Sequence, residues 1–338
     1  MESNTNASNS FSWADVNWNA LRRLRTRFLH FDEREQGAEA DHTDYWRSLS
    51  DLVSYDGTFA ERIGWKWDTV LAELKTRGWT PPEGTLLDWG CGTGVAGRRV
   101  AAAWPQAFGS LLLADRSGPA RHFAIGRARA EAPDLEVRAA TPADAPDVLV
   151  LSHVLNELSP EALEMLLALA CRAQAILWVE PGTHPVSRRL LAVRERLSPH
   201  FRAVSPCTHQ AACGMLAAGN ERHWCHHFAR VPGFVHTDPG WGRFAQTLEL
   251  DLGTVPFSYL VLDRRPAPAN PAEARVIGTP RYYKGFAKIL SCQADGVAER
   301  ILQKRDAPEL FKVMKKAPGS LYRWERDGEK IRSGERVF

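Results

Sequence analysis

No long run of apolar residues occurs in this 338-residue chain. A membrane-spanning helix needs about 20 consecutive apolar residues, and no stretch approaches that length, so we expect no membrane association. The opening MESNTNASNS lacks the apolar core of a secretory signal. Glu2 and Asp15 argue against a transit peptide, which is Arg-rich and poor in acids. We therefore expect a bacterial-type cytoplasmic protein and favour the mitochondrial matrix less.

Cysteine is also scarce. The chain has six cysteines, too few for a disulfide scaffold. In a reducing compartment, grouped cysteines more often bind metal or perform chemistry. Hydrophobic residues make up 44% and charged residues 25% of the chain, which excludes a mainly disordered or fibrous protein. The length allows roughly two domains, or one large domain with an appendage.

The net charge of +3 conceals an uneven distribution. Residues 264–338 contain 17 Lys and Arg against 9 Asp and Glu, a net charge of +8, which leaves −5 for residues 1–263. A basic segment of this kind is a candidate for contact with nucleic-acid phosphates. The alternative is a solvated basic face without a partner.

Helical spacing of Trp18, Leu21 and Leu24 predicts an N-terminal helical region over residues 1–80. Six of the twelve tryptophans lie between Trp13 and Trp79, and we expect them mostly to fill the core.

Residues 81–265 alternate between short apolar strands and amphipathic helices, which predicts an α/β fold with a parallel sheet covered on both faces. A cysteine-rich insertion at 206–227 interrupts this pattern. After a Pro/Ala linker at 264–271, residues 272–338 are predicted to form a small basic module of short strands with one helix, Pro308–Lys316. The predicted strands are Thr85–Asp88, Ser110–Asp115, Leu135–Ala139, Asp147–Val154, Ala175–Glu180, Phe201–Ser205, Phe228–Val231 and Phe257–Asp263, and the helices Val95–Trp104, Pro119–Glu131, Ser159–Arg172 and Pro185–Leu197.

A glycine-rich loop follows the first predicted strand. Asp88 ends that strand, and Gly90, Gly92 and Gly94 lead into a helix. The glycines allow a tight turn and close approach of a ligand to the backbone. Asp115, at the end of the next strand, suits the two ribose hydroxyls of a nucleoside-type cofactor. The alternative is a structural turn that binds no cofactor.

The spacing D-x-G-x-G-x-G resembles motif I of class I S-adenosylmethionine-dependent methyltransferases, which have a Rossmann-like sheet. The resemblance implies that Asp88 and the Gly90–Gly94 backbone hold the methionine moiety, that Asp115 holds the ribose and that Cys91 lines the loop. It also implies that the end of the fourth strand faces the methyl group, so His153, Asn156 and Glu157 are the nearest polar side chains. Asn156 and Glu157 could instead only begin the next helix. No residue can be assigned as a catalytic base, and no Asn/Asp-Pro-Pro-aromatic tetrapeptide of many amino-group methyltransferases follows this strand.

Four further cysteines form a candidate metal site. Cys207, Cys213 and Cys225 have the spacing C-x5-C-x11-C, and Cys292 follows in the basic module. Four thiolates can hold zinc or an iron–sulfur cluster. A mixed Cys/His zinc site is one alternative, because four histidines lie nearby. A second alternative is that Cys207, which follows Pro206, acts as a nucleophile. The four histidines are His209, His223, His226 and His227.

Several sequence pieces together resemble the mitochondrial small-ribosomal-subunit methyltransferase-like family and its bacterial relatives. The match runs from about Pro82 to the C-terminus. The pieces are G-C-G-T-G (90–94), S-H-V-L-N-E-L (152–158), V-E-P-G-T (179–183), S-P-C-T-H-Q-A-A-C (205–213), W-C-H-H-F (224–228) and F-S-Y-L-V-L (257–262).

This resemblance implies a ribosome-associated protein that binds S-adenosylmethionine and acts on small-subunit ribosomal RNA during assembly. It also implies a 4Fe–4S cluster held by Cys207, Cys213, Cys225 and Cys292, whereas Cys171 is interpreted as a buried hydrophobe. Away from the ribosome we expect a monomer.

In the basic module, cations interleave with aromatic residues, a pattern that suits phosphates and unpaired bases. The predicted RNA-binding residues are Arg281, Tyr283, Lys284, Lys288, Lys304, Lys315 and Lys316. The leading hypothesis is an RNA methyltransferase. Alternatives are a non-catalytic assembly factor that keeps cofactor binding and a small-molecule methyltransferase with structural zinc.

Overall fold

The computed structural model describes residues 11–29, 46–266, 273–316 and 319–338. Most of the predicted linker and part of the N-terminal region lie outside these residues. No described helix is both long and apolar enough to span a membrane.

The centre of the molecule is a sheet with strand order β3-β2-β1-β4-β5-β8-β6, and β7 pairs with β8. The five strands from β3 to β5 are parallel, whereas β8 runs antiparallel to both β5 and β6. This confirms the predicted Rossmann-like sheet of class I methyltransferases. The strands are β1 (Gly84–Trp89), β2 (Phe108–Ala114), β3 (Glu136–Ala139), β4 (Val148–Ser152), β5 (Ala175–Pro181), β6 (Arg202–Ser205), β7 (His227–Phe228) and β8 (Pro256–Asp263).

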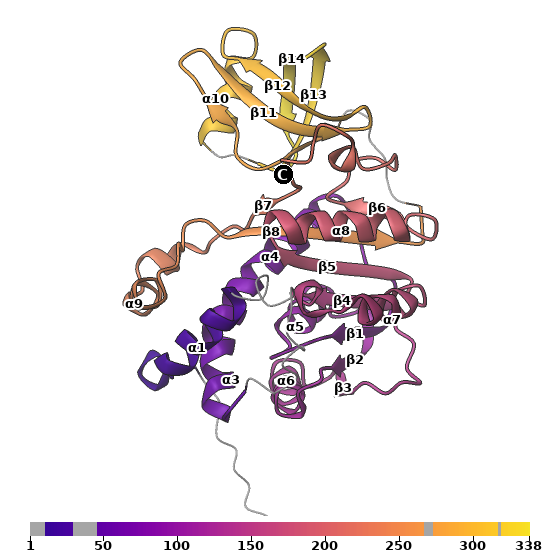
Figure 1. Cartoon of the computed structure of the whole chain (residues 1–338), viewed down its shortest axis with the longest axis vertical. Helices are drawn as coiled ribbons and strands as arrows, with labels where there is room; N and C mark the ends of the chain where they lie inside the picture. The colour runs from indigo at the N-terminus through magenta and orange to yellow at the C-terminus, as the bar shows by residue number, and fades with distance from the viewer. Residues whose placement is uncertain (1–10, 30–45, 267–272, 317–318) are drawn as a thin grey trace, which may run out of the picture.

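Helices cover both faces of this sheet because its strands are apolar on both sides. One face packs against α4 (Glu61–Thr76) and α5 (Val95–Ala103), and the other against α7 (Pro160–Ala170) and α8 (His184–Leu197). Figure 1 shows α7 and α8 on the near side of the sheet. Helix α6 (Gly118–Glu131) lies beside β2 and β3.

Local signals explain where two of these helices begin. The hydroxyl of Ser117 accepts a hydrogen bond from the Ala120 N–H at the start of α6, and that of Ser159 accepts one from Ala162 at the start of α7. A proline follows each cap in the first turn, where its missing N–H costs no hydrogen bond. The cap at Ser159 is the one that the sequence predicts.

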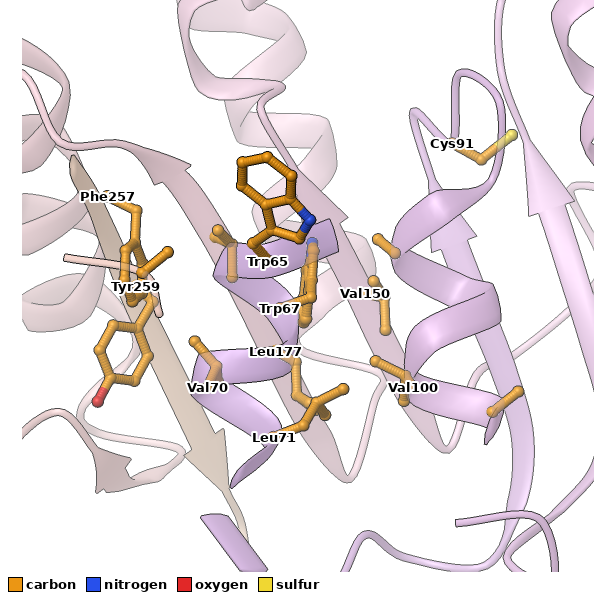
Figure 2. Close-up of a cluster of buried hydrophobic side chains, with 14 of the residues drawn as sticks. Trp65, Trp67, Val70, Leu71, Cys91, Val100, Val150, Leu177, Phe257 and Tyr259 are labelled. Atoms are coloured by element: carbon orange, nitrogen blue, oxygen red, sulfur yellow. The ribbon is translucent and has the colours of Figure 1, made fainter. Parts of the chain in front are cut away.

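The described part of the N-terminal region is mainly helical, as predicted, and α4 packs its tryptophans into the core. Trp65 and Trp67 are 1% and 0% exposed. Figure 2 shows α4 turning its apolar side chains toward Val150 and Leu177 of the sheet. Preceding α4 are a 3-10 turn (Trp13–Asp15), α1 (Trp18–Leu29), α3 (Leu49–Tyr55) and a π-helical turn (Asp56–Ala60).

Residues 229–255 differ from the prediction. The expected strand Phe228–Val231 is only the two-residue β7, and helix α9 (Pro239–Leu248) was not predicted. Asp238 caps α9 by accepting a hydrogen bond from Gly240 N, and Trp241 and Phe244 bury one side of it. The helix extends the apolar cluster that contains Trp13 and Trp65.

The C-terminal module is a small closed barrel. Strand β9 pairs with both β11 and β13, which closes the circuit β9-β11-β12-β14-β13. Closure removes the exposed strand edges that could pair with another chain. Figure 1 shows the barrel next to the edge of the central sheet that β6, β7 and β8 form. Its elements are β9 (Glu273–Val276), β10 (Arg281–Tyr282), β11 (Phe286–Gln293), β12 (Gly296–Gln303), α10 (Pro308–Lys316), β13 (Leu321–Asp327) and β14 (Lys330–Arg336).

A buried ion pair joins α4 to this barrel. Arg275 of β9 donates hydrogen bonds from its two terminal nitrogens to the two carboxylate oxygens of Glu73, and both side chains are almost fully buried. Ser205 of β6 and Tyr259 of β8 also donate to this carboxylate, at 2.6 and 2.9 Å. Although burial opposes ionisation, Arg275 lowers the pKa of Glu73 to about 2. The interaction therefore contributes stability above the ordinary pKa of Glu and loses it as the pH falls toward 2.

We predict that Arg275→Met lowers the free energy of unfolding by about 3–5 kcal/mol, because it removes the bidentate partner of the buried Glu73 charge and leaves only Arg77 at 4.0 Å. Denaturant unfolding at pH 7 measures the change. The matched control is Arg196→Gln, which removes a solvent-exposed pair with Glu164 and should cost at most about 1 kcal/mol. The double variant Glu73→Gln/Arg275→Met should lose less than Arg275→Met alone. Equal, small losses in all three variants would contradict this account.

Candidate functional site

A cavity of about 760 Å³ lies at the carboxyl ends of β1, β2, β4 and β5. This edge is where open α/β sheets bind their ligands, and the volume is typical of a small-molecule site. The glycine loop forms one wall, and Tyr55, Phe59 and Lys66 of the N-terminal helical region form another. Of the predicted cofactor-binding residues, Gly90, Cys91, Gly92, Asp115 and His153 line the cavity.

The glycine loop adopts a backbone that only glycine takes easily. Gly90, Gly92 and Gly94 have φ angles of 71°, 53° and 81°, in the left-handed region that disfavours side chains. A Cβ at Gly90 would lie 2.5 Å from Cγ1 of Val154. A Cβ at Gly92 would meet no atom within 4 Å, so open space lies above this part of the loop.

Asp88 and Gly94 lie behind the loop and are not among the residues that line the cavity. Oδ2 of Asp88 accepts a hydrogen bond from Gly97 N at 2.8 Å, at the start of α5. Burial raises the pKa of Asp88 to about 7, and its other oxygen has no partner among the described residues. Asp88 therefore positions the start of α5, and its predicted contact with the methionine moiety of a cofactor stays a prediction.

Asp115 is fixed by the backbone on both sides. Gly92 N donates to one of its carboxylate oxygens and Ser117 N to the other, each at 2.8 Å. An ionised carboxylate can accept about four hydrogen bonds, so two lone pairs remain for a ligand. The side chain is only partly buried and faces the same cavity as Gly92.

On the far side of the cavity, Lys66 of α4 contacts His153. Nζ of Lys66 lies 3.1 Å from Nε2 of His153. His153 follows β4 with a φ angle of 58°, a strained conformation for a residue with a side chain. Burial and the nearby Arg62 lower the pKa of Lys66 to about 7, against an opposing effect of Glu180. Burial also lowers the pKa of His153, so the imidazole is neutral.

Glu180 lies at the end of β5, on the same cavity. Its Oε1 accepts hydrogen bonds from Trp178 Nε1 and from the backbone N–H groups of Val154 and Leu155. Burial raises its pKa to about 7, and Oε2 has no partner among the described residues. Lys66, His153 and Glu180 thus place three titratable groups at one wall of the cavity.

The four candidate ligand cysteines lie in one region, between the cysteine-rich insertion and the barrel. Three of them, Cys213, Cys225 and Cys292, pack in one apolar cluster with Met215. Burial, and then the nearby Cys207 and Cys213, raise the pKa of the Cys292 thiol to about 12. Burial and the other three cysteines raise the pKa of Cys225 as well. Because the other three cysteines disfavour the ionised form of Cys225, the four sulfur atoms are close enough to interact electrostatically.

The surroundings of these thiols are partly polar and basic. His209 Nε2 lies 3.4 Å from Cys292 Sγ, and His227 Nε2 lies 3.6 Å from Cys225 Sγ. Although burial opposes it, the electrostatic attraction of Cys207, and then a hydrogen bond to it, raise the pKa of Arg194. Over the described part of the chain, no group of three or more His, Cys, Asp or Glu side chains is arranged so that it could hold a metal ion.

The seven predicted RNA-binding residues all lie on the barrel. Arg281 and Lys288 pair with Glu299. In contrast, Lys284, Lys304, Lys315 and Lys316 are exposed and have no ion-pair partner within the described ranges. Tyr283 is 46% exposed and stacks on Phe286 at the turn before β11.

A family model described as mitochondrial small ribosomal subunit Rsm22 matches residues 66–324, which is more than half of the chain. The chain belongs to the Rsm22 family. The matched residues include Lys66, the glycine loop, the part of the cavity that residues from 66 onward line and all four candidate ligand cysteines. Among curated proteins, none matches the sequence.

Solved methyltransferase structures are similar at low scores. A candidate RNA methyltransferase of Pyrococcus horikoshii is 11% identical, with 71% of this chain and 98% of that chain covered and a TM-score of 0.36. The plantazolicin methyltransferase BpumL, bound to a substrate analogue and SAH, is 16% identical, with 73% and 98% covered and a TM-score of 0.39. A candidate tRNA (m1A22) methyltransferase of Streptococcus pneumoniae, bound to S-adenosyl-L-methionine, is 12% identical, with 60% and 75% covered and a TM-score of 0.33. These likenesses carry no argument about substrate.

Lys66 and Glu180 were not among the residues predicted for the site. Lys66 is the one polar position between two buried tryptophans on a helix that the sequence marks as core-forming. Glu180 was visible only as part of the piece Val-Glu-Pro-Gly-Thr. The sequence did contain one signal for Lys66, which is a lysine between two core tryptophans. Burying an unpaired charge costs free energy, so a lysine at such a position indicates a functional role.

We predict that the amine of Lys66 is half neutral near pH 7, because burial and Arg62 lower its pKa. Only neutral amines react with acetic anhydride. The initial acylation rate of Lys66, measured by mass spectrometry over a pH series, should therefore level off above about pH 8. Lys75 is the matched control, since it lies on the same helix and is exposed. Parallel pH profiles for the two lysines would contradict the prediction.

Proposed function

We propose that this protein is an S-adenosylmethionine-dependent methyltransferase that acts on small-subunit ribosomal RNA during ribosome assembly. The observation that carries the proposal is the open space above Gly92, beside the fixed carboxylate of Asp115, in a member of the Rsm22 family. The family description supports association with the small ribosomal subunit. We place the protein in the compartment of that ribosome, which the sequence predicts to be the cytoplasm, and as a monomer when it is off the subunit.

The residues of the cavity suit this cofactor. The spare lone pairs of Asp115 would accept hydrogen bonds from the two ribose hydroxyls. The backbone of Gly90–Gly92 would lie against the methionine part, where the missing side chains leave room. When bound, S-adenosylmethionine supplies an electrophilic methyl group on a positively charged sulfur atom.

Lys66 and His153 are the groups best placed to accept a proton from a nucleophile in the cavity. A base whose pKa lies near the working pH is the most effective, and the pKa of Lys66 is about 7. If Nε2 of the neutral His153 accepts a hydrogen bond from Lys66, the amine lone pair can turn toward the cavity. Glu180 would then stabilise the ammonium that forms.

We also propose that Cys207, Cys213, Cys225 and Cys292 hold a 4Fe–4S cluster. Four thiols share one region, which is the donor set that such a cluster needs. Burial, and then the neighbouring cysteines, raise the pKa values of Cys213, Cys225 and Cys292. Bound iron would favour the thiolate form of these ligands, and its positive charge would offset the repulsion among them. Arg194 and Arg275 supply compensating positive charge.

The family resemblance that links these four cysteines implies a 4Fe–4S cluster, and zinc is the alternative that four thiolates could also hold. Because Cys292 is in β11 and the other three ligands precede the linker, the cluster would join the methyltransferase-like unit, residues 81–265, to the barrel, residues 272–338.

The test of the function uses immature small subunits and S-adenosylmethionine with a tritiated methyl group. We expect the wild-type protein to bind the subunits and to label their RNA. Asp115→Asn should keep subunit binding but lose about 10-fold or more in cofactor affinity, because a hydrogen bond to a charged group contributes about 1.5–3 kcal/mol. Calorimetry with S-adenosylhomocysteine measures that affinity.

Asp134→Asn is the control, because Asp134 is exposed and outside the cavity. Cofactor binding without any label in RNA would refute the methyltransferase and leave a non-catalytic assembly factor. Failure to bind the cofactor at all would refute the assignment of the cavity.

The cluster is tested by metal and sulfide analysis of protein purified without oxygen. We expect about four iron and four sulfide per chain and a brown colour, with most of the iron lost in Cys225→Ser and Cys292→Ser. Cys171→Ser is the matched control, because Cys171 lies at the end of α7, outside the site, and it should keep the iron. A colourless protein with one zinc per chain would overturn the cluster.

A further inference from the structure

The five main strands of the barrel follow a specific order. Numbered 1 to 5 in chain order, β9, β11, β12, β13 and β14 are arranged 1-2-3-5-4, and strand 4 pairs again with strand 1. Strands 3 and 5 are parallel, the other pairs are antiparallel, and α10 lies between strands 3 and 4. This is the arrangement of the OB-fold, a barrel that binds ligands on the face of strands 2 and 3 and in the loop between strands 1 and 2.

One half of that face is covered by the cysteine-rich insertion. Side chains of β11 alternate, with Ala287, Ile289 and Ser291 buried inside the barrel. Outside, Cys292 and Val297 pack in the cluster with Met215. The approach is so close that a Cβ at Gly214 would lie 2.8 Å from Val297 N. This half of the face is therefore already occupied by the chain itself.

The other half of the face is exposed and carries an aromatic stack. Tyr283 and Phe286 stack with ring centroids 4.5 Å apart and planes 10° apart. The backbone of Lys304 bonds to Gly285 O at 2.9 Å, which places Lys304 beside this turn, next to Lys284. Lys288 lies on the same strand face as Cys292, four residues away.

Glu299 of β12 neutralises two of the cations on this half. It pairs with Lys288 at 2.7 Å and with Arg281. A phosphate that approaches Arg281 or Lys288 must compete with this carboxylate. The exposed half therefore combines an aromatic surface for base stacking, lysines without an ion-pair partner in the described ranges, and two cations that pair with Glu299.

We propose that a short single-stranded RNA segment binds the uncovered half of this barrel face, with a base on Tyr283 and phosphates along Lys284, Lys288 and Lys304. Single-stranded RNA fits because its bases can stack on an aromatic side chain, which paired bases cannot do. This site rests on the proposed function, because it names the surface on which the protein would contact ribosomal RNA. The bound RNA segment would end near Cys292 of β11, where the cysteine-rich insertion covers the face.

The test measures fluorescence anisotropy of a labelled 10-nucleotide RNA, alone or as a duplex, with the whole protein purified without oxygen, over a range of salt. We expect the single strand to bind more tightly than the duplex. Tyr283→Ala should weaken binding about 5- to 150-fold, because stacking contributes about 1–3 kcal/mol per base, with little change in salt dependence. Lys304→Gln should weaken binding and reduce the salt slope by about 0.7, the value for one phosphate contact on a single strand.

Glu299→Gln is the most informative variant, because it releases Arg281 and Lys288 from their ion pairs. RNA binding should therefore become tighter, and its dependence on salt should become steeper. Lys75→Gln removes an exposed lysine from α4 and serves as the control. Unchanged affinity and slope in Glu299→Gln, or equal binding of duplex and single strand, would overturn the proposal. These outcomes do not depend on methyl transfer, so failure of the site and failure of the proposed enzyme can be told apart.

Discussion

The buried pair between Glu73 and Arg275 is the interaction on which the arrangement of the molecule depends. Through one carboxylate it connects α4, the edge strand β6, its neighbour β8 and the first barrel strand. A buried charge pair contributes to stability only when its remaining hydrogen-bonding capacity is satisfied. Here Ser205, Tyr259 and the carbonyl of Pro206 complete it. The barrel is thereby held in one orientation next to the cysteine-rich insertion.

Helix α4 links the two candidate sites. Lys66, near its start, reaches the cavity, and Glu73, seven residues later, reaches the barrel. At 1.5 Å per residue these positions are about 10 Å apart along the helix. The tryptophans between and beside them hold α4 against the sheet (Figure 2). One rigid, core-packed helix therefore positions both a cavity group and the contact to the barrel.

The sequence predicted those features whose signals are local. The glycine loop, Asp115, the cap at Ser159 and the helix Pro308–Lys316 each depend on residues within a few positions of one another, and the structure contains all four elements. Cys207, Cys213, Cys225 and Cys292 were linked by family resemblance, and the structure brings them into one region. The sequence did not predict the contact between Lys66 and His153, because these residues are 87 positions apart. It did not predict the ion pair between Glu73 and Arg275 either, because these are 202 positions apart. The closure of the barrel likewise depends on strand pairings that no local pattern encodes.

The proposed methylation of small-subunit ribosomal RNA by this member of the Rsm22 family is tested most directly by mass spectrometry. Methylated nucleotides in that RNA are mapped in cells with and without the protein. The account predicts that a methyl group disappears in its absence and returns with the wild-type protein but not with Asp115→Asn. An unchanged set of methylated nucleotides, together with accumulated immature subunits, would contradict it.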